Sequence, residues 1–171
     1  ASYWYQIAAL SQSAKVVLPM LFADSLQGDS KVAEIFDMLG VKTEYRKDSV
    51  TIAKKSDVIT EFNYDFVNQP DLAQTFVVTC SLLNIPFRFT GLQSLKIKET
   101  DRIEALKKEM IKLGYVIHDA EDSILWWDGE RAEPSYQAID TYEDHRMAMA
   151  FAPAALVIDK ITINNPEVVS K

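Results

Sequence analysis

The sequence predicts a mixed α/β fold (α+β in some classification schemes) that is built from a repeated unit, and three observations lead to this prediction. Apolar residues recur at helical spacing in several segments, short strand-like segments follow them, and the whole pattern returns after roughly 74 residues. The 171 residues are 48% hydrophobic, which is enough to bury a core. We therefore expect a single domain of packed helices and sheets.

An amphipathic helix that leads into a short strand occurs twice, in segments 32–52 and 103–126. Each copy has a Leu-Gly pair where the helix should end, because glycine fits a left-handed cap. Each then has an Asp-Ser pair that marks a turn. The second copy continues into a predicted hairpin that turns at Asp128-Gly129. The matching pairs lie 74 positions apart: Leu39-Gly40 and Leu113-Gly114, then Asp48-Ser49 and Asp122-Ser123.

A second kind of predicted helix is apolar around its whole circumference. Segment 72–83 follows Asp71 and segment 147–156 follows Asp144, and we interpret both aspartates as N-caps. Because these helices have no polar stripe, they should be buried on all sides. Segment 1–10 resembles them without the cap.

The repeats suggest how the chain is organised. We predict two nearly complete copies, at 1–64 and 65–138, and a truncated third copy at 139–171. The chain begins at Ala1 inside a helix-like run and stops at Lys171 without a terminal element. These two ends favour a fragment of a longer protein.

Composition limits the classes of function. The net charge of −7 argues against nucleic acid as the main partner. No apolar run approaches the roughly 20 residues that span a bilayer, and no signal peptide is visible. The single cysteine, Cys80, cannot form an internal disulfide, which favours a cytoplasmic setting. With two histidines, one cysteine and no close ligand spacing, we expect no metal site.

Two predicted helices have an arginine in their first turn. Arg102 follows Asp101, which can cap its helix in a capping-box pattern with Glu104, and Arg146 lies two residues after Asp144, next to His145. The partial positive charge of a helix start disfavours a cation there. Each arginine either pairs with a carboxylate of the protein or helps the helix start to bind a carboxylate or phosphate. The spacing alone leaves both interpretations open.

Other polar residues also have two interpretations. Asp71 is a helix cap or a catalytic carboxylate, and His145 is an anion ligand, a general acid or a capping partner. Lys98 and Glu99 lie just before a helix start, where they would strengthen a site at Arg102. His118 is most simply a strand residue.

Several stretches resemble one enzyme family. The stretches KIKETDRIEALKKEMIKLG (96–114) and DHRMAMAFAPAAL (144–156) resemble the two C-terminal signatures of the 5-enolpyruvylshikimate-3-phosphate synthase family, the 3-phosphoshikimate 1-carboxyvinyltransferases. NQPDLAQT (68–75) and ASYWYQIAAL (1–10) resemble further helix starts of the family. The resemblance covers the whole chain in the right order.

This resemblance implies a fold and an activity. Family members have two lobes, each with three βαβαββ units around a pseudo-threefold axis, with buried helices inside and sheets outside, as in an inverse α/β barrel. The chain resembles most of the C-terminal lobe, so its partner would be the N-terminal lobe of the same protein. The family transfers the enolpyruvyl group of phosphoenolpyruvate to the 5-hydroxyl of shikimate 3-phosphate and releases phosphate, without a cofactor. We expect the isolated chain to be inactive.

The resemblance also implies roles for individual residues. Asp71 would contact the shikimate hydroxyls and serve as the base for the attacking 5-hydroxyl. Glu99 would transfer a proton at the phosphoenolpyruvate methylene, and Lys98 would bind near the ring hydroxyls and assist the acid–base steps. Arg102 and Arg146 would hold the phosphoenolpyruvate carboxylate.

Three further residues complete the implied substrate-binding set. Lys171 would bind the departing phosphate, with His145 beside it. Ser94 stands where many family members have asparagine, so it would keep a shorter hydroxyl contact or none.

Two other functions remain as alternatives. A related transferase moves the enolpyruvyl group onto a UDP-amino sugar, but the Lys-Glu-Thr-Asp-Arg and Asp-His-Arg-Met-Ala stretches favour the shikimate enzyme. A non-catalytic α/β repeat that binds a protein partner is the second alternative. It predicts that Lys98, Arg102 and Arg146 do not converge and that a large exposed apolar patch lies elsewhere.

Overall fold

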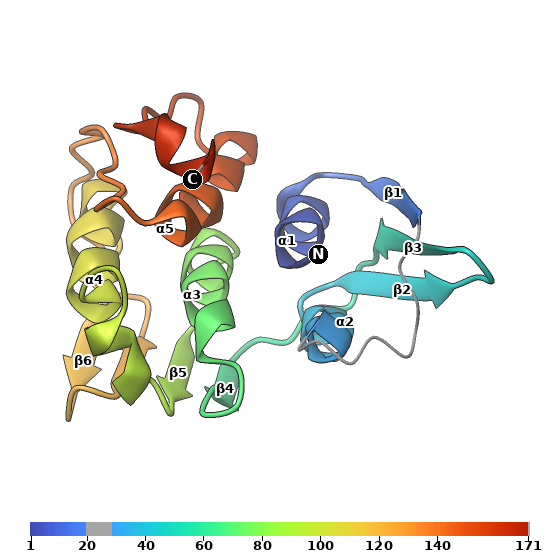
Figure 1. Cartoon of the computed structure of the whole chain (residues 1–171), viewed down its shortest axis with the longest axis horizontal. Coiled ribbons are helices and arrows are strands. Elements are labelled where there is room, and N and C mark those ends of the chain that lie inside the picture. The colour runs from blue at the N-terminus through green and yellow to red at the C-terminus, as the bar shows by residue number, and fades with distance from the viewer. Residues whose placement is uncertain (20–28, 171) are drawn as a thin grey trace. The chain divides into compact units, whose positions relative to one another are not determined.

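The computed structural model describes residues 1–19 and 29–170, and the chain divides into two compact units, Ala1–Thr60 and Glu61–Lys171 (Figure 1). The first unit contains a three-stranded sheet in the order β1-β3-β2, in which both pairs of neighbours are antiparallel. Its helices pack on each other and on the sheet, around buried side chains such as Phe36 and Ile52. Its elements are α1 (Ser2–Leu10), β1 (Lys15–Pro19), α2 (Asp29–Met38), β2 (Val41–Tyr45) and β3 (Ser49–Lys54).

The second unit contains a four-stranded sheet in the order β4-β5-β7-β6. The first pair is parallel, with Phe62 opposite Phe87, and the other two pairs are antiparallel. The second unit's elements are β4 (Phe62–Asp65), η1 (Pro70–Leu72), α3 (Ala73–Leu82), β5 (Phe87–Thr90), η2 (Gln93–Ile97), α4 (Arg102–Lys112), β6 (His118–Ala120), β7 (Ile124–Trp127), α5 (His145–Phe151), η3 (Ala152–Leu156) and η4 (Pro166–Ser170).

The same strand order occurs in both units. A strand after a buried helix pairs with the second strand of a hairpin, as β1 does with β3 and β5 does with β7. A parallel bridge between Ile139 and Ile163 repeats the pairing of Phe62 with Phe87, at the place where a third copy would begin. The recurrence that the sequence shows is therefore present in the strand topology. The repeat boundaries themselves stay a prediction.

Two glycines end the amphipathic helices, as predicted. Gly40 follows α2 with φ +85°, and Gly114 follows α4 with φ +89°. A Cβ atom at Gly40 would lie 2.8 Å from Cγ2 of Val58, and one at Gly114 would lie 2.8 Å from the carbonyl oxygen of Ala132. Both positions require glycine for two reasons, the left-handed backbone and the close neighbour.

The prediction that helix 72–83 is buried is confirmed over α3, because all ten residues of this helix are buried. The helix packs against α4, α5 and β5 (Figure 1). Aromatic rings fill the space between α3 and the sheet. Phe76 lies 6.1 Å from Phe62 and 5.6 Å from Phe66, measured between ring centroids.

The same prediction is wrong for the second half of segment 147–156. The α-helix ends at Phe151 and continues as the 3-10 turn η3, in which Ala152 and Leu156 are exposed. Pro153 has no N–H group with which to extend the α-helical hydrogen bonds. No described residue covers this side of the turn, so its apolar side chains remain in contact with solvent.

The predicted hairpin around Asp128-Gly129 is also wrong. The chain does turn there, with the N–H of Glu130 donating to Oδ1 of Asp128 at 3.1 Å. The segment that follows makes one isolated bridge and no strand. The hairpin is instead β6–β7, which turns at Glu121 and Asp122, both with φ +54°. Two consecutive left-handed residues suit a tight hairpin turn.

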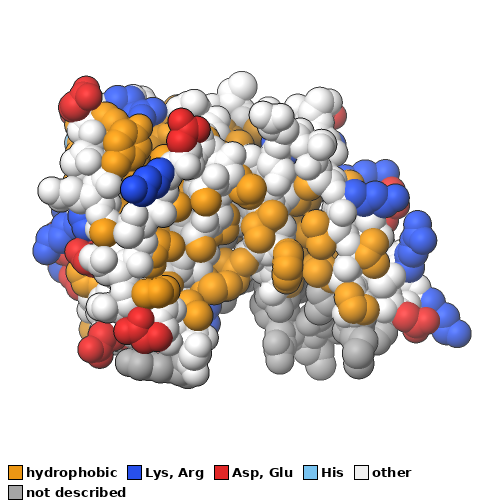
Figure 2. Space-filling model, turned by 90° about the horizontal axis from the view of Figure 1, so that it is seen from above, with side chains coloured by type: hydrophobic (Ala, Val, Ile, Leu, Met, Phe, Trp, Pro, Cys, Tyr) orange, Lys and Arg blue, Asp and Glu red, His pale blue; other side chains and the backbone are white. Residues whose placement is uncertain are grey.

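Some hydrophobic side chains reach the surface (Figure 2), and the large exposed ones are scattered along the sequence, as Trp4, Ile97 and Val157 show. The one cysteine, Cys80, is free and buried. Among the described residues, no helix combines the length and the apolar character that crossing a membrane requires.

Candidate anion-binding site

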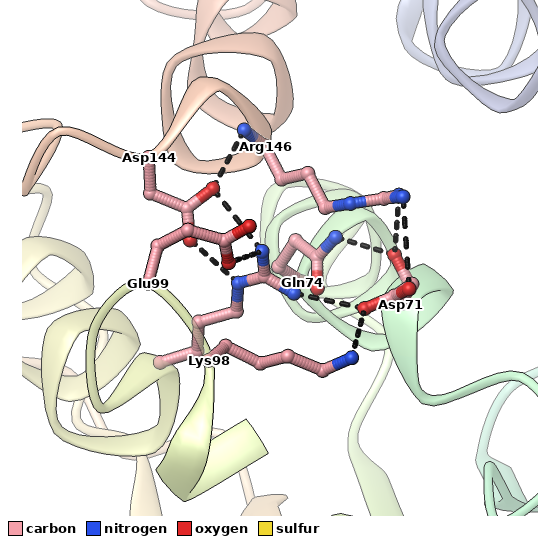
Figure 3. A network of polar contacts seen from close by, with 7 residues as sticks. Asp71, Gln74, Lys98, Glu99, Asp144 and Arg146 are labelled. Carbon is pink, nitrogen blue, oxygen red and sulfur yellow. Dashed lines mark hydrogen bonds and ion pairs between the residues drawn. The ribbon is translucent and has the colours of Figure 1, made fainter. Parts of the chain in front are cut away.

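Five of the residues that the sequence singles out lie together in the unit Glu61–Lys171 (Figure 3). Asp71 lies in η1, and Lys98 and Glu99 lie in the loop between η2 and α4. Arg102 is the first residue of α4, and Arg146 is the second residue of α5. The residues at or just before the starts of α3, α4 and α5 are thus brought together in space. The predicted convergence is confirmed, and it contradicts the expectation for a non-catalytic module.

The carboxylate of Asp71 is at the centre of the cluster. Its Oδ1 accepts a hydrogen bond from Nη1 of Arg102 at 2.9 Å and lies 3.3 Å from Nζ of Lys98. Its Oδ2 lies 3.6 Å from Nη2 of Arg146. The side-chain amide of Gln74 lies beside Asp71 and donates to its backbone carbonyl, which holds the turn (Figure 3). One carboxylate therefore faces three cations.

Asp71 is not the helix cap that the sequence suggests. It lies inside the 3-10 turn, and the N-cap position of α3 belongs to Leu72, which makes no side-chain cap. Pro70 starts the turn one residue earlier than a cap at Asp71 would allow, because its fixed φ suits the first helical position. The Asp71 side chain is consequently free to face the cations.

Arg102 is held by carboxylates of the protein. Its side chain is only 1% exposed, and its guanidinium donates to Asp144 through Nε at 2.6 Å and through Nη2 at 3.2 Å. It also contacts Glu99 at 2.7 Å and Asp71 at 2.9 Å. Of the two interpretations of this arginine, internal pairing is what the structure shows. Three carboxylates offset the unfavourable position at the helix start.

Both predicted aspartate caps of the charged helices are confirmed. Asp101 accepts from the N–H of Glu104 at 3.2 Å, and Asp144 accepts from the N–H of Arg146 at 2.9 Å. The carboxylate of Glu104 is directed to Lys107 at 2.9 Å, where the predicted capping box would direct it back toward Asp101. The cap of α5 thus uses the same carboxylate that binds Arg102.

The cluster is close to electrically balanced, and this balance sets the state of Asp71. Partial burial pushes the pKa of Asp71 upward, but Arg146, Lys98 and Arg102 together outweigh burial and hold the pKa below its ordinary value. The carboxylate is therefore ionised at neutral pH. In this arrangement it attracts cations and hydroxyl groups strongly but is a weak base.

The members of the cluster differ in their access to solvent. The side chains of Lys98 and Arg146 are 31% and 33% exposed, whereas Arg102 and Asp144 are buried. The contact between Arg146 and Asp71, at 3.6 Å, is also longer than a strong ion pair. An anion that arrives from solvent would therefore meet Lys98 and Arg146 first.

The remaining predicted site residues lie at the edge of the cluster or beyond it. His145 is exposed at the start of α5, and the ion pairs among the described residues do not include it. Ser94 lies in η2, and its buried Oγ has no hydrogen-bond partner within residues 1–19 and 29–170. Lys171 lies outside the described residues. His118 is in strand β6, as predicted.

Sequence reasoning missed two parts of the cluster. It treated Asp144 as a cap only, although the carboxylate also binds Arg102. It also passed over Gln74, which holds the backbone of Asp71. No sequence signal connected Asp144 to an arginine 42 positions earlier.

Other reactive groups lie away from the cluster. His118, Asp128 and Glu130 place their ligand atoms within 4.8 Å of one another, so they are the one group that could hold a metal within the part of the chain that the structure describes. Here Nε2 of His118 bonds to Glu130 at 2.6 Å. Burial raises the pKa of the Cys80 thiol, so this cysteine is not a nucleophile at neutral pH.

Comparisons with known proteins show the family of this chain. The family model of EPSP synthase (3-phosphoshikimate 1-carboxyvinyltransferase) matches residues 1–171. A 3-phosphoshikimate 1-carboxyvinyltransferase of Bacteroides fragilis strain YCH46 is 64% identical over 172 residues, which cover 100% of this chain and 42% of that protein. One of Idiomarina loihiensis is 36% identical, over 97% of this chain and 38% of that protein.

A solved structure has the same fold. EPSP synthase of Acinetobacter baumannii superposes with a TM-score of 0.78 at 22% sequence identity, over 99% of this chain and 41% of that one. The repeated topology and the charged cluster define an α/β repeat protein with a polar site at its helix starts. Because the family model covers the whole chain, the chain belongs to the EPSP synthase family. It spans 42% of the length of its Bacteroides relative.

Proposed function

We propose that this chain is the C-terminal lobe of an enzyme that transfers the enolpyruvyl group of phosphoenolpyruvate to the 5-hydroxyl of shikimate 3-phosphate. The observation that carries the proposal is the convergence of Asp71, Lys98, Glu99, Arg102 and Arg146 in a chain of this family. Both substrates are anions, and the accessible Lys98 and Arg146 are the groups that can bind them. The rest of the enzyme would supply the other wall of the site.

The reaction has an addition step and an elimination step, and the carboxylates of the cluster can make the proton transfers of both. In the addition step, the 5-hydroxyl gives its proton to Asp71 while its oxygen bonds to C2 of phosphoenolpyruvate, and Glu99 gives a proton to the methylene carbon. In the elimination step, the new methyl group returns a proton to Glu99 as the C–O bond to phosphate breaks, and Asp71 passes its proton to the departing phosphate, so that both carboxyl groups return to their starting states. The products are the enolpyruvyl ether and phosphate. Lys98 stabilises the charge that shifts between these groups.

The cations of the cluster divide the work of binding. Arg146 leaves a long contact with Asp71 when it turns to the phosphoenolpyruvate carboxylate, and the buried Arg102 contributes its positive charge to the same place while it stays bonded to Asp144. The departure of Arg146 removes one of the charges that lower the pKa of Asp71. The arrival of the substrate thereby makes Asp71 a better base. His145 and Lys171 would face the departing phosphate, and Ser94 would contact the substrate through its hydroxyl.

Phosphate release by the complete enzyme tests this proposal. With both substrates present, Asp71→Asn should lower kcat, because the variant keeps the shape and loses the base. Arg146→Ala should instead raise KM for phosphoenolpyruvate by about 10- to 150-fold, the equivalent of about 1.5–3 kcal/mol for a charged hydrogen bond. Arg88→Ala, which removes an arginine stacked on Trp126 away from the cluster, is the matched control. An Asp71→Asn variant that keeps its full kcat would exclude Asp71 as the base.

A further inference from the structure

The residues that lead into α5 have an unusual backbone. Tyr142 and Glu143 have φ values of +55° and +56°, the left-handed region that residues other than glycine seldom adopt. They directly precede Asp144, and the N–H of Asp144 donates to the carbonyl of Thr141 at 2.8 Å. The turn is therefore tight, and its last residue is the carboxylate that binds Arg102. A strained turn persists only where other contacts hold it.

A buried carboxylate supplies those contacts. The side chain of Glu109, on α4, is 1% exposed. It accepts a hydrogen bond from Oη of Tyr142 at 2.6 Å and another from the N–H of Asp140 at 3.0 Å, and it lies 2.6 Å from Nζ of Lys112. A carboxylate is costly to bury unless its oxygens are bonded in this way. Both carboxylate oxygens of Glu109 are thus bonded, although this residue lies outside the proposed catalytic cluster.

The Tyr142 hydroxyl is protonated at neutral pH. Burial raises the pKa of the Tyr142 hydroxyl, and the adjacent Glu109 carboxylate raises it further. The hydroxyl therefore stays protonated at neutral pH and donates to Glu109. This bond is a charge-assisted one, which is about twice as strong as a bond between neutral groups.

The helix α4 holds the segment before α5 at two points. Arg102 and Glu109 are seven residues apart on this helix, which is two turns, so both side chains project from the same face. Arg102 binds Asp144, and Glu109 binds Tyr142. We propose that the Glu109–Tyr142 bond is a positioning device for the site: it keeps the left-handed turn in place and so fixes the Asp144 carboxylate against Arg102 and the first turn of α5. This inference rests on the proposed function of the cluster.

The device has a specific consequence for binding. One oxygen of Asp144 accepts from Nε of Arg102, and the other accepts from the N–H of Arg146. If the turn relaxes, the Asp144 carboxylate moves, and the side chain of Arg102 and the backbone of Arg146 lose the group that positions both of them. Binding of the phosphoenolpyruvate carboxylate should suffer, whereas Asp71 and Glu99 keep their positions on η1 and in the loop before α4. Tyr142 and Glu109 are therefore positioning residues rather than catalytic ones.

Tyr142→Phe in the complete enzyme tests the inference. This variant leaves Glu109 with Lys112 and the N–H of Asp140, so the fold should survive. We expect KM for phosphoenolpyruvate to rise about 10-fold, with kcat and KM for shikimate 3-phosphate within about twofold of wild type. Tyr136→Phe is the matched control, because Tyr136 is also a left-handed tyrosine but is 57% exposed.

Two further variants separate positioning from general stability. Glu109→Gln combined with Tyr142→Phe should cost less than the sum of the two single effects, because Glu109→Gln removes the charge that strengthens the bond that Tyr142→Phe deletes. Glu143→Gly should restore part of the loss in the Tyr142→Phe background, since glycine adopts a left-handed φ without strain. Glu143→Ala should restore nothing. Full additivity of the first pair, or equal rescue by alanine, would overturn the proposal.

A readout that is independent of turnover distinguishes this inference from the proposed function. Hydrogen exchange at the N–H of Arg146, which donates to Asp144, should become about 10-fold faster in Tyr142→Phe and stay unchanged in Tyr136→Phe. Unchanged exchange at Arg146 overturns the positioning role, whether or not the enzyme is active. A wild-type enzyme that releases no phosphate from the two substrates counts against the proposed function instead.

Discussion

Arg102 and Asp144 lie 42 positions apart in the sequence and are joined by two buried hydrogen bonds, of 2.6 and 3.2 Å. Asp144 also caps α5 through the N–H of Arg146. A single carboxylate therefore caps the N-terminus of α5 and binds the side chain of the first residue of α4. The arrangement fixes the two helix starts relative to each other before any substrate binds.

Asp144→Asn should destabilise the protein strongly. The variant removes the one fully buried carboxylate that faces the Arg102 guanidinium and leaves it with the more exposed Glu99 and Asp71. The loss of one partner of a buried ion pair costs about 3–5 kcal/mol. Urea denaturation of the complete protein measures this change. Asp122→Asn, in the exposed β6–β7 turn, is the control and should have little effect. Equal midpoints for the two variants would show that the pair adds no stability.

Acid should remove the contribution of Asp71 to stability. Its pKa in the folded state lies below its ordinary value near 3.8, so the contribution is present above that value and is lost as the pH falls through the lower folded pKa. We expect wild type to lose stability relative to Asp71→Asn as the pH falls below about 4. Urea midpoints measured between neutral and acid pH test this. The exposed carboxylate Asp48, replaced by asparagine, provides the comparison.

Gly114→Ala should destabilise more than Gly129→Ala. Both glycines have a positive φ, of +89° and +98°, which costs about 1–2 kcal/mol for alanine. At Gly114 the new Cβ would also lie 2.8 Å from the carbonyl oxygen of Ala132, whereas at Gly129 it would meet nothing within 4 Å. The difference between the two unfolding free energies isolates the steric contact. A difference near zero would mean that the segment around Ala132 moves aside freely.

The 171-residue chain by itself should not turn over the two substrates. Its charged cluster is partly open to solvent, and exposed ion pairs act in a high dielectric, where each contact is weak. Phosphate release by the isolated chain, with both substrates present, is the measurement, and the complete enzyme is the reference. Turnover comparable to that of the complete enzyme would show that the remainder of the enzyme is not needed for the site.

Local signals predicted much of the fold. Helical spacing and the Leu-Gly pairs located α2 and α4. These signals are reliable because a glycine cap depends on the local backbone conformation and little on the rest of the fold. The hairpin was placed at Asp128-Gly129 because this dipeptide is a strong turn former. The Asp122-Ser123 pair did predict a turn, but it did not show that β6 and β7 pair across Glu121 and Asp122. Pairing partners depend on the whole sheet.

The site was predictable in its members and not in its bonds. The arginines at two helix starts were correctly singled out as exceptions to the dipole rule, and they do converge with Asp71. The partner of Arg102 was not predictable, because the contact with Asp144 depends on how α4 and α5 pack. Glu109 and Tyr142 gave no signal at all, since a glutamate on an amphipathic helix usually faces solvent.

A structure of the complete enzyme with phosphoenolpyruvate and shikimate 3-phosphate analogues bound would show whether the cluster around Asp71 binds both substrates. We expect the phosphoenolpyruvate carboxylate to accept hydrogen bonds of about 2.7–2.9 Å from the Arg146 guanidinium, with the Arg146–Asp71 contact broken and Asp71 next to the 5-hydroxyl. Asp144 should remain bonded to Arg102. Both analogues bound elsewhere, with Arg146 still in contact with Asp71, would show that the cluster is not the substrate site.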